Sequence, residues 1–249
     1  MKNGDTNTTH ATQNSIQELR RLIEGLESLH EYRLPQRAYH IIRLAIRDLI
    51  LPPGKTILER EMSEVLEMSR TPVREALVRL ETEGVVRLIP RRGFIVEPIV
   101  QEDLKEIYQI VENLDGLAIE IATKKAEDEK INQLEAIIEQ QEAALENKNL
   151  KEWAVLDDRF HSMIIELAGN KRLSSVIEIH SDQTYRARLF TINNRPLPLR
   201  SIKEHKAITA CMRAKDENAA RIMMQSHRKR AQQEILAGIE KINNKQEQD

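Results

Sequence analysis

Hydrophobic residues recur at helical spacing in three successive segments near the start of the chain. The first stripe predicts a helix that begins near Arg37 and ends before Pro52-Pro53-Gly54; it consists of Ile41, Ile42, Ala45, Ile46 and Leu49. Met62, Val65 and Leu66 predict a second helix from about Glu59. A third helix is predicted over residues 71–83, after a tight turn at residues 67–69, with Gly84 placed to end it.

The spacing changes to alternation after Gly84. Val86 and Leu88 alternate with polar residues, Pro90-Arg91-Arg92-Gly93 follows, and Phe94 and Val96 alternate again. This pattern predicts a short hairpin with two arginines at its tip. Three helices followed by a basic hairpin indicate a winged helix-turn-helix domain, whose second motif helix enters the DNA major groove.

The flanking segments are helical or polar. Residues 1–14 are polar, and we expect them to be disordered. A short amphipathic helix is predicted next from Ile16, Leu19, Leu22, Ile23 and Leu26, and we expect it to pack on the protein itself. From Ile99 onward the pattern is helix after helix with a break at residues 193–199. The fold class is therefore mainly α, with an N-terminal extension at 1–32, a winged helix-turn-helix domain at 33–98, an all-helical domain at 99–243 and a polar tail at 244–249.

Charge separates the winged segment from the rest of the chain. The 249 residues carry 38 Lys and Arg against 40 Asp and Glu, but residues 33–98 carry a net charge of +3, which leaves −5 for the remainder. The single cysteine excludes an internal disulfide, and no apolar run approaches the roughly 18 residues that span a bilayer. These features predict a soluble, cytoplasmic protein with no membrane partner.

Two arginines lie at the start of the third helix. Val73, Ala76, Leu77 and Leu80 share one face, which places Arg74 on the opposite face, and Arg70 lies in the same first turn. Arginine can form bidentate hydrogen bonds to guanine O6 and N7, and residues in the first turn of a recognition helix make such contacts. Ser69 and Thr71 are placed to bind phosphates, and Arg91 and Arg92 to reach the DNA backbone or minor groove. The alternative is a solvated basic face.

The segment "PGKTILEREMSEVLEMSRTPVREALVRLETEGVVRLIPRRGFIV" resembles the DNA-binding domain of the GntR family of bacterial transcriptional regulators over its whole length. The resemblance implies operator contacts by Arg60, Ser69, Arg70, Thr71, Arg74 and Gly93; Arg91 and Arg92 follow from their position alone. Glu67 departs from the family, which usually has glycine there. We expect backbone strain at Glu67 and a negative charge near the DNA.

Three histidines and one aspartate are predicted to point inward from separate helices. Asp157 and His161 lie four residues apart on the face of Trp153 and Ile164. His205 shares a stripe with apolar neighbours, and so does His227. Buried without partners, these groups would be costly, and a divalent ion such as Zn would satisfy them. The alternative is that each histidine is an ordinary core residue.

The segments "DDRFHSMIIELAGNKRL", "EHKAI" and "AKDENAARIMMQSH" resemble the FCD effector domain of FadR-type GntR regulators. Metal-binding members of that class use an Asp, three residues, a His and two further histidines. The resemblance implies a metal site at Asp157, His161, His205 and His227, with Zn, Ni or another transition metal, and leaves His180 outside it. It also implies a small-molecule effector, of carboxylate type, although Val111 stands where the family commonly has an arginine that meets the carboxylate.

The leading hypothesis is a homodimeric transcription factor whose helical domain binds metal and a small metabolite, which alters its affinity for double-stranded operator DNA. It is not expected to be an enzyme or to have catalytic residues. One alternative is a metal-dependent hydrolase with an accessory DNA-binding domain. The open metal position that a hydrolase needs is plausible, but the sequence contains no HExxH-type pairing and no evident catalytic carboxylate beside the ligands. Another alternative is a regulator whose metal is purely structural.

Overall fold

The structure is a computed structural model that describes residues 16–26, 29 and 31–246. The chain divides into two compact units, with the division between Ile99 and Val100. The expected disorder of residues 1–14 and the last three residues of the predicted polar tail lie outside the described residues.

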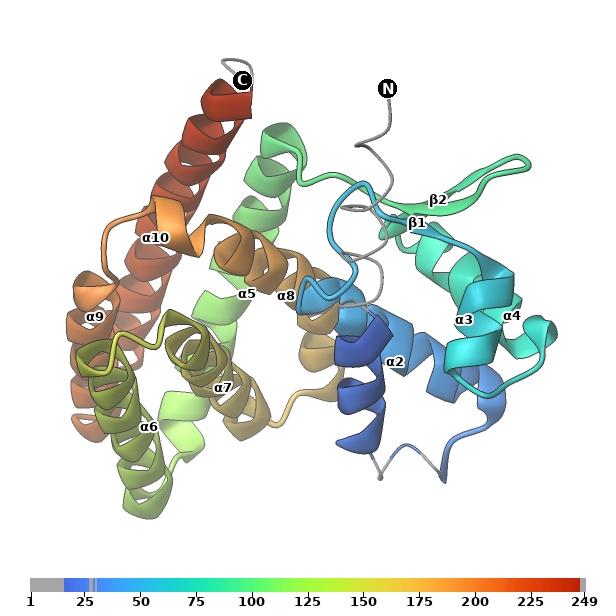
Figure 1. Ribbon diagram of the computed structural model, residues 1–249. Helices are drawn as coiled ribbons and strands as arrows, with labels where there is room; N and C mark the ends of the chain where they lie inside the picture. Colours follow the sequence, from blue (N-terminus) through green and yellow to red (C-terminus); the bar gives the residue numbers. More distant parts are fainter. Residues whose placement is uncertain (1–15, 27–28, 30, 247–249) are drawn as a thin grey trace. The chain divides into compact units, whose positions relative to one another are not determined.

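The first unit is a small helical domain with a sheet at its end (Figure 1). After a helix over residues 16–24 come α2 (Leu34–Arg47), β1 (Thr56–Ile57), α3 (Glu59–Val65), α4 (Arg70–Thr82), β2 (Val86–Ile89) and β3 (Gly93–Val96). The sheet is antiparallel with the order β1-β3-β2. The predicted helices and hairpin are confirmed. Sequence reasoning missed β1, because a strand of two residues carries no periodic signal.

The apolar stripes form one core in this unit. Ile42 of α2, Leu77 of α4 and Val96 of β3 are completely buried. Leu19 joins the same core with 2% of its surface exposed, so the expectation that the first amphipathic helix packs on the protein itself is confirmed. Gly84 ends α4 with a φ of +70°, as its position after the helix predicts.

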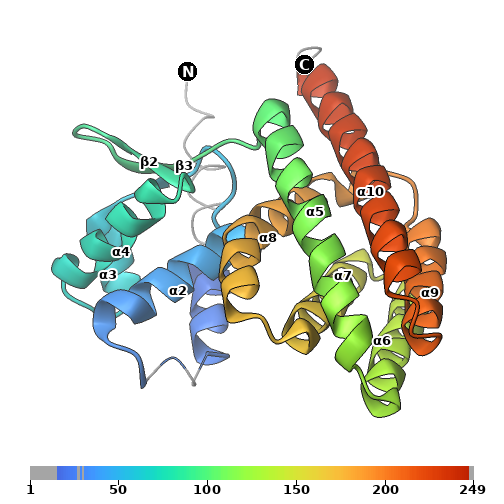
Figure 2. The same cartoon turned by 180° about the vertical axis from the view of Figure 1, so that it is seen from behind.

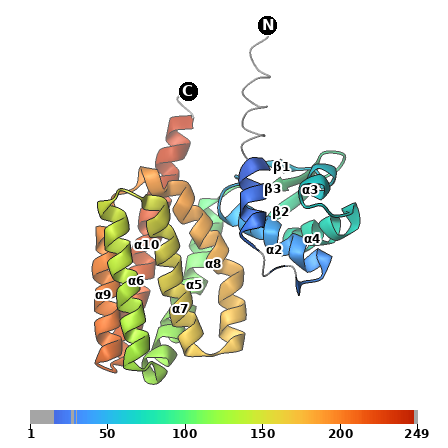
Figure 3. The same cartoon turned by 60° about the horizontal axis from the view of Figure 1, so that its bottom comes forward.

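The second unit consists of helices and has no strand among residues 100–246 (Figure 2). Its elements are α5 (Gln101–Lys125), α6 (Asp128–Glu146), α7 (Leu150–Ala168), α8 (Lys171–Thr191), a short 3₁₀ helix η2 (Ile192–Asn194), α9 (Leu199–Arg213) and α10 (Glu217–Gln246). The long helices α5 and α10 lie side by side (Figures 1 and 2), and α6, α7 and α9 run alongside one another in the bundle (Figure 3). The predicted break at residues 193–199 separates α8 from α9.

Local signals set the ends of α7, which carries two of the candidate metal ligands, and the start of α8. The side chain of Asn149 accepts a hydrogen bond from the Glu152 amide at 3.1 Å and caps α7. Gly169 ends α7 with a φ of +61°, and Asn170 caps α8 by accepting from the Leu173 amide at 3.2 Å. These caps fix where α7 begins and ends, and therefore which of its residues face the core.

Candidate metal centre and nucleic-acid interface

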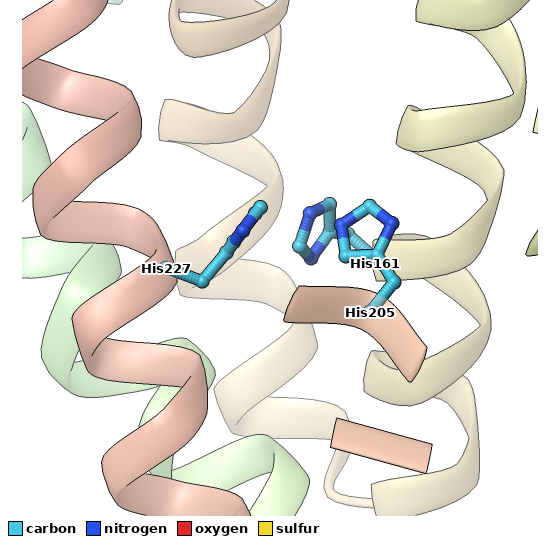
Figure 4. A group of neighbouring side chains, drawn as sticks. All are labelled: His161, His205 and His227. Atoms are coloured by element: carbon cyan, nitrogen blue, oxygen red, sulfur yellow. The ribbon is translucent and has the colours of Figure 1, made fainter. Parts of the chain in front are cut away.

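Three buried histidines from three different helices meet inside the second unit, which we call the helical unit. His161 comes from α7, His205 from α9 and His227 from α10, and each is at most 4% exposed. One ring nitrogen of each lies within 4.8 Å of the corresponding atoms of the other two. Figure 4 shows the three imidazole rings converging from opposite sides of the bundle. Helical spacing brought these residues to inward faces, and the packing of the bundle brings them together.

The neighbour of His205 determines which of its ring nitrogens is free. Gln141 donates from Nε2 to the carbonyl oxygen of Leu156 at 3.2 Å, which directs its Oε1 toward the imidazole. His205 Nδ1 lies 2.9 Å from that oxygen and therefore carries the hydrogen. The Nε2 atom of His205 keeps its lone pair, and it has no hydrogen-bond partner among the described residues.

Glu204 likewise determines which ring nitrogen of His227 carries the hydrogen. His227 Nδ1 donates to Glu204 Oε2 at 2.8 Å, and Arg230 donates to the same carboxylate from Nε and Nη2. Burial alone would raise the pKa of Glu204, but the hydrogen bonds from His227 and Arg230 lower it to about 2. Glu204 is therefore ionised at neutral pH, and it holds the His227 hydrogen on Nδ1 and leaves Nε2 to face the other rings.

The three imidazoles are neutral at neutral pH. Burial is the largest cause that lowers the pKa of each, and it places the pKa of His161 and His205 well below the usual value. Neither ring nitrogen of His161 has a hydrogen-bond partner within the part of the chain described. Unsatisfied buried polar atoms require an explanation, and neutral imidazoles are the form that binds metals. The donor set fits a borderline divalent ion such as Zn²⁺.

Asp157 lies beside the histidines and is shared with an arginine. Its Oδ2 atom is 3.8 Å from His161 Nε2, and its Oδ1 atom is 3.7 Å from His205 Nε2. Arg188 of α8 approaches more closely, with Nη1 at 2.9 Å from Oδ2. Burial opposes the charged form of Asp157, yet Arg188, followed by His205, lowers its pKa. The fourth predicted ligand is thus in place as a carboxylate, but its nearest charged neighbour is a guanidinium.

A second buried ion pair and an unpartnered hydroxyl belong to the same unit. Arg228, the residue after His227, donates from Nε to Asp115 Oδ2 at 2.6 Å. Arg228 Nη1 and the Tyr108 hydroxyl are buried without hydrogen-bond partners among the described residues. Burial raises the pKa of Tyr108 against the opposing charges of Arg188 and Arg228. Val111, where the family resemblance leads us to expect an arginine, is completely buried.

Sequence reasoning missed the polar groups that surround the predicted ligands. These are Gln141, Glu204, Arg188, Arg228 and Tyr108. The only available signal was adjacency, because Glu204 precedes His205 and Arg228 follows His227 in the sequence. Gln141 and His205 lie 64 residues apart, and no spacing rule connects them.

The residues predicted to bind DNA lie on the surface of the first unit, which we call the winged unit. All are exposed except Gly93, which is half-buried; they are Arg60, Ser69, Arg70, Thr71, Arg74, Arg91, Arg92 and Gly93. Ser69 is the N-cap residue of α4, and its side chain makes no capping hydrogen bond within the described residues. Arg74 points away from the core, and its Nη1 atom lies 3.5 Å from Glu59 Oε1.

Two backbone positions explain local sequence choices at this surface. Glu67, in the turn between α3 and α4, has a φ of +54°, so the expected strain is present. Gly93 has a φ of +90°, and a Cβ atom there would lie 2.6 Å from the carbonyl oxygen of Ile57. Glycine at residue 93 is therefore required by the approach of β1, whatever contact it makes with DNA.

No helix within the described residues is both long enough and apolar enough to cross a membrane.

Comparison with known proteins gives two matches that together cover most of the chain. Residues 34–96 match the family described as bacterial regulatory proteins, gntR family, and residues 106–230 match the FCD domain. Among solved structures, the chain is similar to Escherichia coli McbR/YncC, with a TM-score of 0.71, 21% identity, and coverage of 80% of this chain and 95% of that one. A GntR regulator from Rhodococcus has a TM-score of 0.69 at 19% identity, covering 81% and 97%. At these identities the likeness shows the fold.

Curated relatives are named as regulators of transcription. The Nta operon transcriptional regulator of Aminobacter aminovorans is 32% identical over 69% of this chain and 80% of its own length. A helix-turn-helix transcriptional regulator of Agrobacterium vitis is 39% identical over 53% of this chain and 79% of its own length. The transcriptional repressor RspR of Escherichia coli is 27% identical over 83% and 89%. The chain therefore belongs to the GntR family of bacterial transcriptional regulators, in the group whose second domain is an effector-binding FCD domain.

Proposed function

We propose that this DNA-binding regulator holds a divalent transition-metal ion between Asp157, His161, His205 and His227, and that a small anionic metabolite bound beside that site controls its affinity for operator DNA. The convergence of three buried, neutral imidazoles with ligand atoms within 4.8 Å of one another carries the proposal. We assign zinc first, with nickel or another transition metal as alternatives.

The second layer of residues supports this assignment. Metal-bound histidines generally donate their other ring hydrogen to an acceptor, which fixes the ring and raises its basicity. His205 has Gln141 in this role and His227 has Glu204. A histidine buried only for packing would not need a charged acceptor that is itself held by Arg230.

The charges beside the site favour an anionic effector. The buried guanidiniums of Arg188 and Arg228 balance the carboxylates of Asp157 and Asp115. A bound divalent ion would add positive charge and an open coordination position for an oxygen ligand. Arg188 Nη1, Arg228 Nη1 and the Tyr108 hydroxyl have no hydrogen-bond partners within the described residues, and they are available to a carboxylate. These groups replace the arginine that the family commonly has at the position of Val111.

At the DNA, we assign base contacts to Arg70 and Arg74 of α4 and phosphate or minor-groove contacts to the hairpin arginines. One small winged domain contacts too few bases for tight specific binding, so we propose a homodimer on a near-palindromic operator. On the strength of the family resemblance, we assign the dimer contact to the helical domain. Because the metal ligands come from α7, α9 and α10, occupancy of the site constrains how these helices pack. A coupling of about 1–3 kcal/mol would then be enough to change operator occupancy.

The test is elemental analysis together with operator binding for His205→Ala and His227→Ala. Both variants should lose metal, and both should lose the response of operator affinity to added metal and effector. His180→Ala is the matched control, since His180 is a half-buried histidine of α8 outside the cluster. Full metal content in either cluster variant means that the site is misassigned. Loss of metal with an unchanged effector response means that the metal is structural.

A further inference from the structure

The carboxylate of Asp157 lies close to two kinds of partner, an arginine and the histidines of the candidate metal site. Its Oδ2 atom lies 2.9 Å from Arg188 Nη1 and 3.8 Å from His161 Nε2, and its Oδ1 atom lies 3.7 Å from His205 Nε2. Asp157 and Arg188 are 2% and 6% exposed at their side chains, so water does not screen their attraction. The pull of Arg188 on Asp157 therefore competes directly with any cation held by the histidines.

The pair of Asp157 and Arg188 is held by charge without a well-aligned hydrogen bond. Neither Asp157 Oδ2 nor Arg188 Nη1 has a hydrogen-bond partner of acceptable geometry in the described part of the chain. The nearby pair of Arg228 and Asp115 is different, because Arg228 Nε donates to Asp115 Oδ2 at 2.6 Å. Hydrogen bonding fixes Arg228 to its carboxylate and leaves Arg188 free to exchange one anion for another.

We propose that Arg188 is an exchangeable counterion: it neutralises Asp157 in the metal-free protein, weakens metal binding there, and transfers to a carboxylate of the effector when that ligand arrives. This inference rests on the proposed metal site and anionic effector. The single carboxylate of Asp157 cannot pair fully with both Arg188 and a metal ion. When an anion binds Arg188, the carboxylate of Asp157 becomes free to bind the metal ion. Without Arg188, Asp157 would be a buried carboxylate with no charged partner in the metal-free state.

Reciprocal linkage follows from the shared aspartate. An anion that binds Arg188 should strengthen metal binding at Asp157, and a metal at Asp157 should strengthen binding of the anion by the same factor. The helical domain would then respond to metal and carboxylate together. Either ligand alone would bind more weakly than the pair.

Zinc titration of the full-length protein against a competing chelator tests this inference. Removal of the competitor in Arg188→Gln should tighten zinc binding by roughly tenfold, within the usual range of coupling between sites. The same substitution should lower the melting temperature of the metal-free protein and enlarge the rise in melting temperature caused by zinc. A residue that only supported the fold would lower both the stability and the zinc affinity. Arg172→Gln, at an exposed arginine of α8, is the control and should match the wild type.

A second arm uses acetate as the anion, with ionic strength held constant by chloride. Acetate should tighten zinc binding by the wild type clearly more than by Arg188→Gln, because the variant keeps the open coordination position for acetate but has no arginine to release from Asp157. Equal tightening in both proteins, or zinc affinity in Arg188→Gln at or below that of the wild type, would overturn the inference. Should Arg188→Gln fail to fold, Arg188→Lys decides: it keeps the charge with a looser pair, and it should bind zinc more tightly than the wild type by a smaller factor. Zinc affinity in Arg188→Lys at or below wild type also overturns the inference. A wild type that binds no zinc would instead refute the proposed metal site.

Discussion

Glu204 of α9 accepts the Nδ1 hydrogen of His227 of α10 at 2.8 Å, and so it joins the two helices and selects the tautomer of the imidazole. We predict that Glu204→Gln lowers zinc affinity about 10-fold to 100-fold, the usual effect of removing an acceptor from a metal-bound histidine. The amide oxygen of glutamine is a weaker acceptor than a carboxylate oxygen. If the amide turned the other way, its NH2 group would face His227 Nδ1 and could not accept the hydrogen of that nitrogen. Competition titration with a chelator measures the change.

Glu139→Gln is the control for this prediction, because Glu139 is an exposed glutamate of the helical unit. It should bind zinc as the wild type does. Wild-type zinc affinity in a folded Glu204→Gln protein would show that Glu204 does not support the ligand.

We predict that Arg74→Ala removes the preference for operator over scrambled DNA, at a cost of about 1–3 kcal/mol for the operator alone. Arg74 is exposed on α4. Within the described residues its one ion pair is with Glu59, with Nη1 at 3.5 Å from Oε1. Fluorescence anisotropy with both DNAs measures the preference. Retention of wild-type discrimination would refute the assignment of α4 as the recognition helix.

We predict a different result for Arg91→Ala, at the tip of the hairpin. A lost phosphate contact weakens binding to specific and random DNA alike and reduces the slope of log affinity against log salt by about one. Arg172→Ala, in the helical unit, should leave both quantities unchanged. A loss confined to the operator would indicate that Arg91 reads sequence.

Periodicity was enough to predict much of this structure and to orient the candidate ligands. Helical spacing places His161 with Trp153 and Ile164, and all three side chains are buried together in α7. The same argument orients Arg74 outward, since Val73 and Leu77 form the opposite, buried face. Position within one helix is a local property, and local sequence determines it.

The supporting shell of the candidate site could not be predicted in this way. Arg188 meets Asp157 across two helices, and Gln141 meets His205 across 64 positions of sequence. Such contacts depend on how the helices pack, which the hydrophobic stripe of each helix leaves open. A buried arginine such as Arg228 also gives no signal of its own, because in sequence it reads as a surface residue.

Tyr39 of α2 provides a pH-dependent prediction for the winged unit. Its hydroxyl donates to Glu83 Oε2 at 2.8 Å, and burial followed by this hydrogen bond raises the pKa of Tyr39 to about 12. Because the folded pKa lies above the unfolded value near 10, the stabilisation is complete below about pH 10 and is lost as the pH rises toward 12. The gap in unfolding free energy between the wild type and Tyr39→Phe should therefore narrow as the pH rises from about 10 to about 12. Denaturant titrations measure it, and a gap that stays constant over this range would contradict the prediction.

Glu67 supplies the last prediction, which separates backbone strain from charge. Its φ of +54° costs a residue with a side chain about 1 kcal/mol or more, and glycine is free of this cost but loses more entropy on folding. Glu67→Gly should therefore raise the unfolding free energy of the winged unit by about 0.5–1 kcal/mol. It also removes a negative charge three positions before Arg70, so DNA binding should tighten severalfold at low salt and less at high salt. Glu67→Gln removes the charge and keeps the strain, so it should tighten DNA binding without the gain in stability. Thermal melts and salt-dependent anisotropy read the two effects separately. A Glu67→Gly protein that melts below the wild type would contradict the strain argument, and equal DNA affinity in all three proteins would contradict the charge argument.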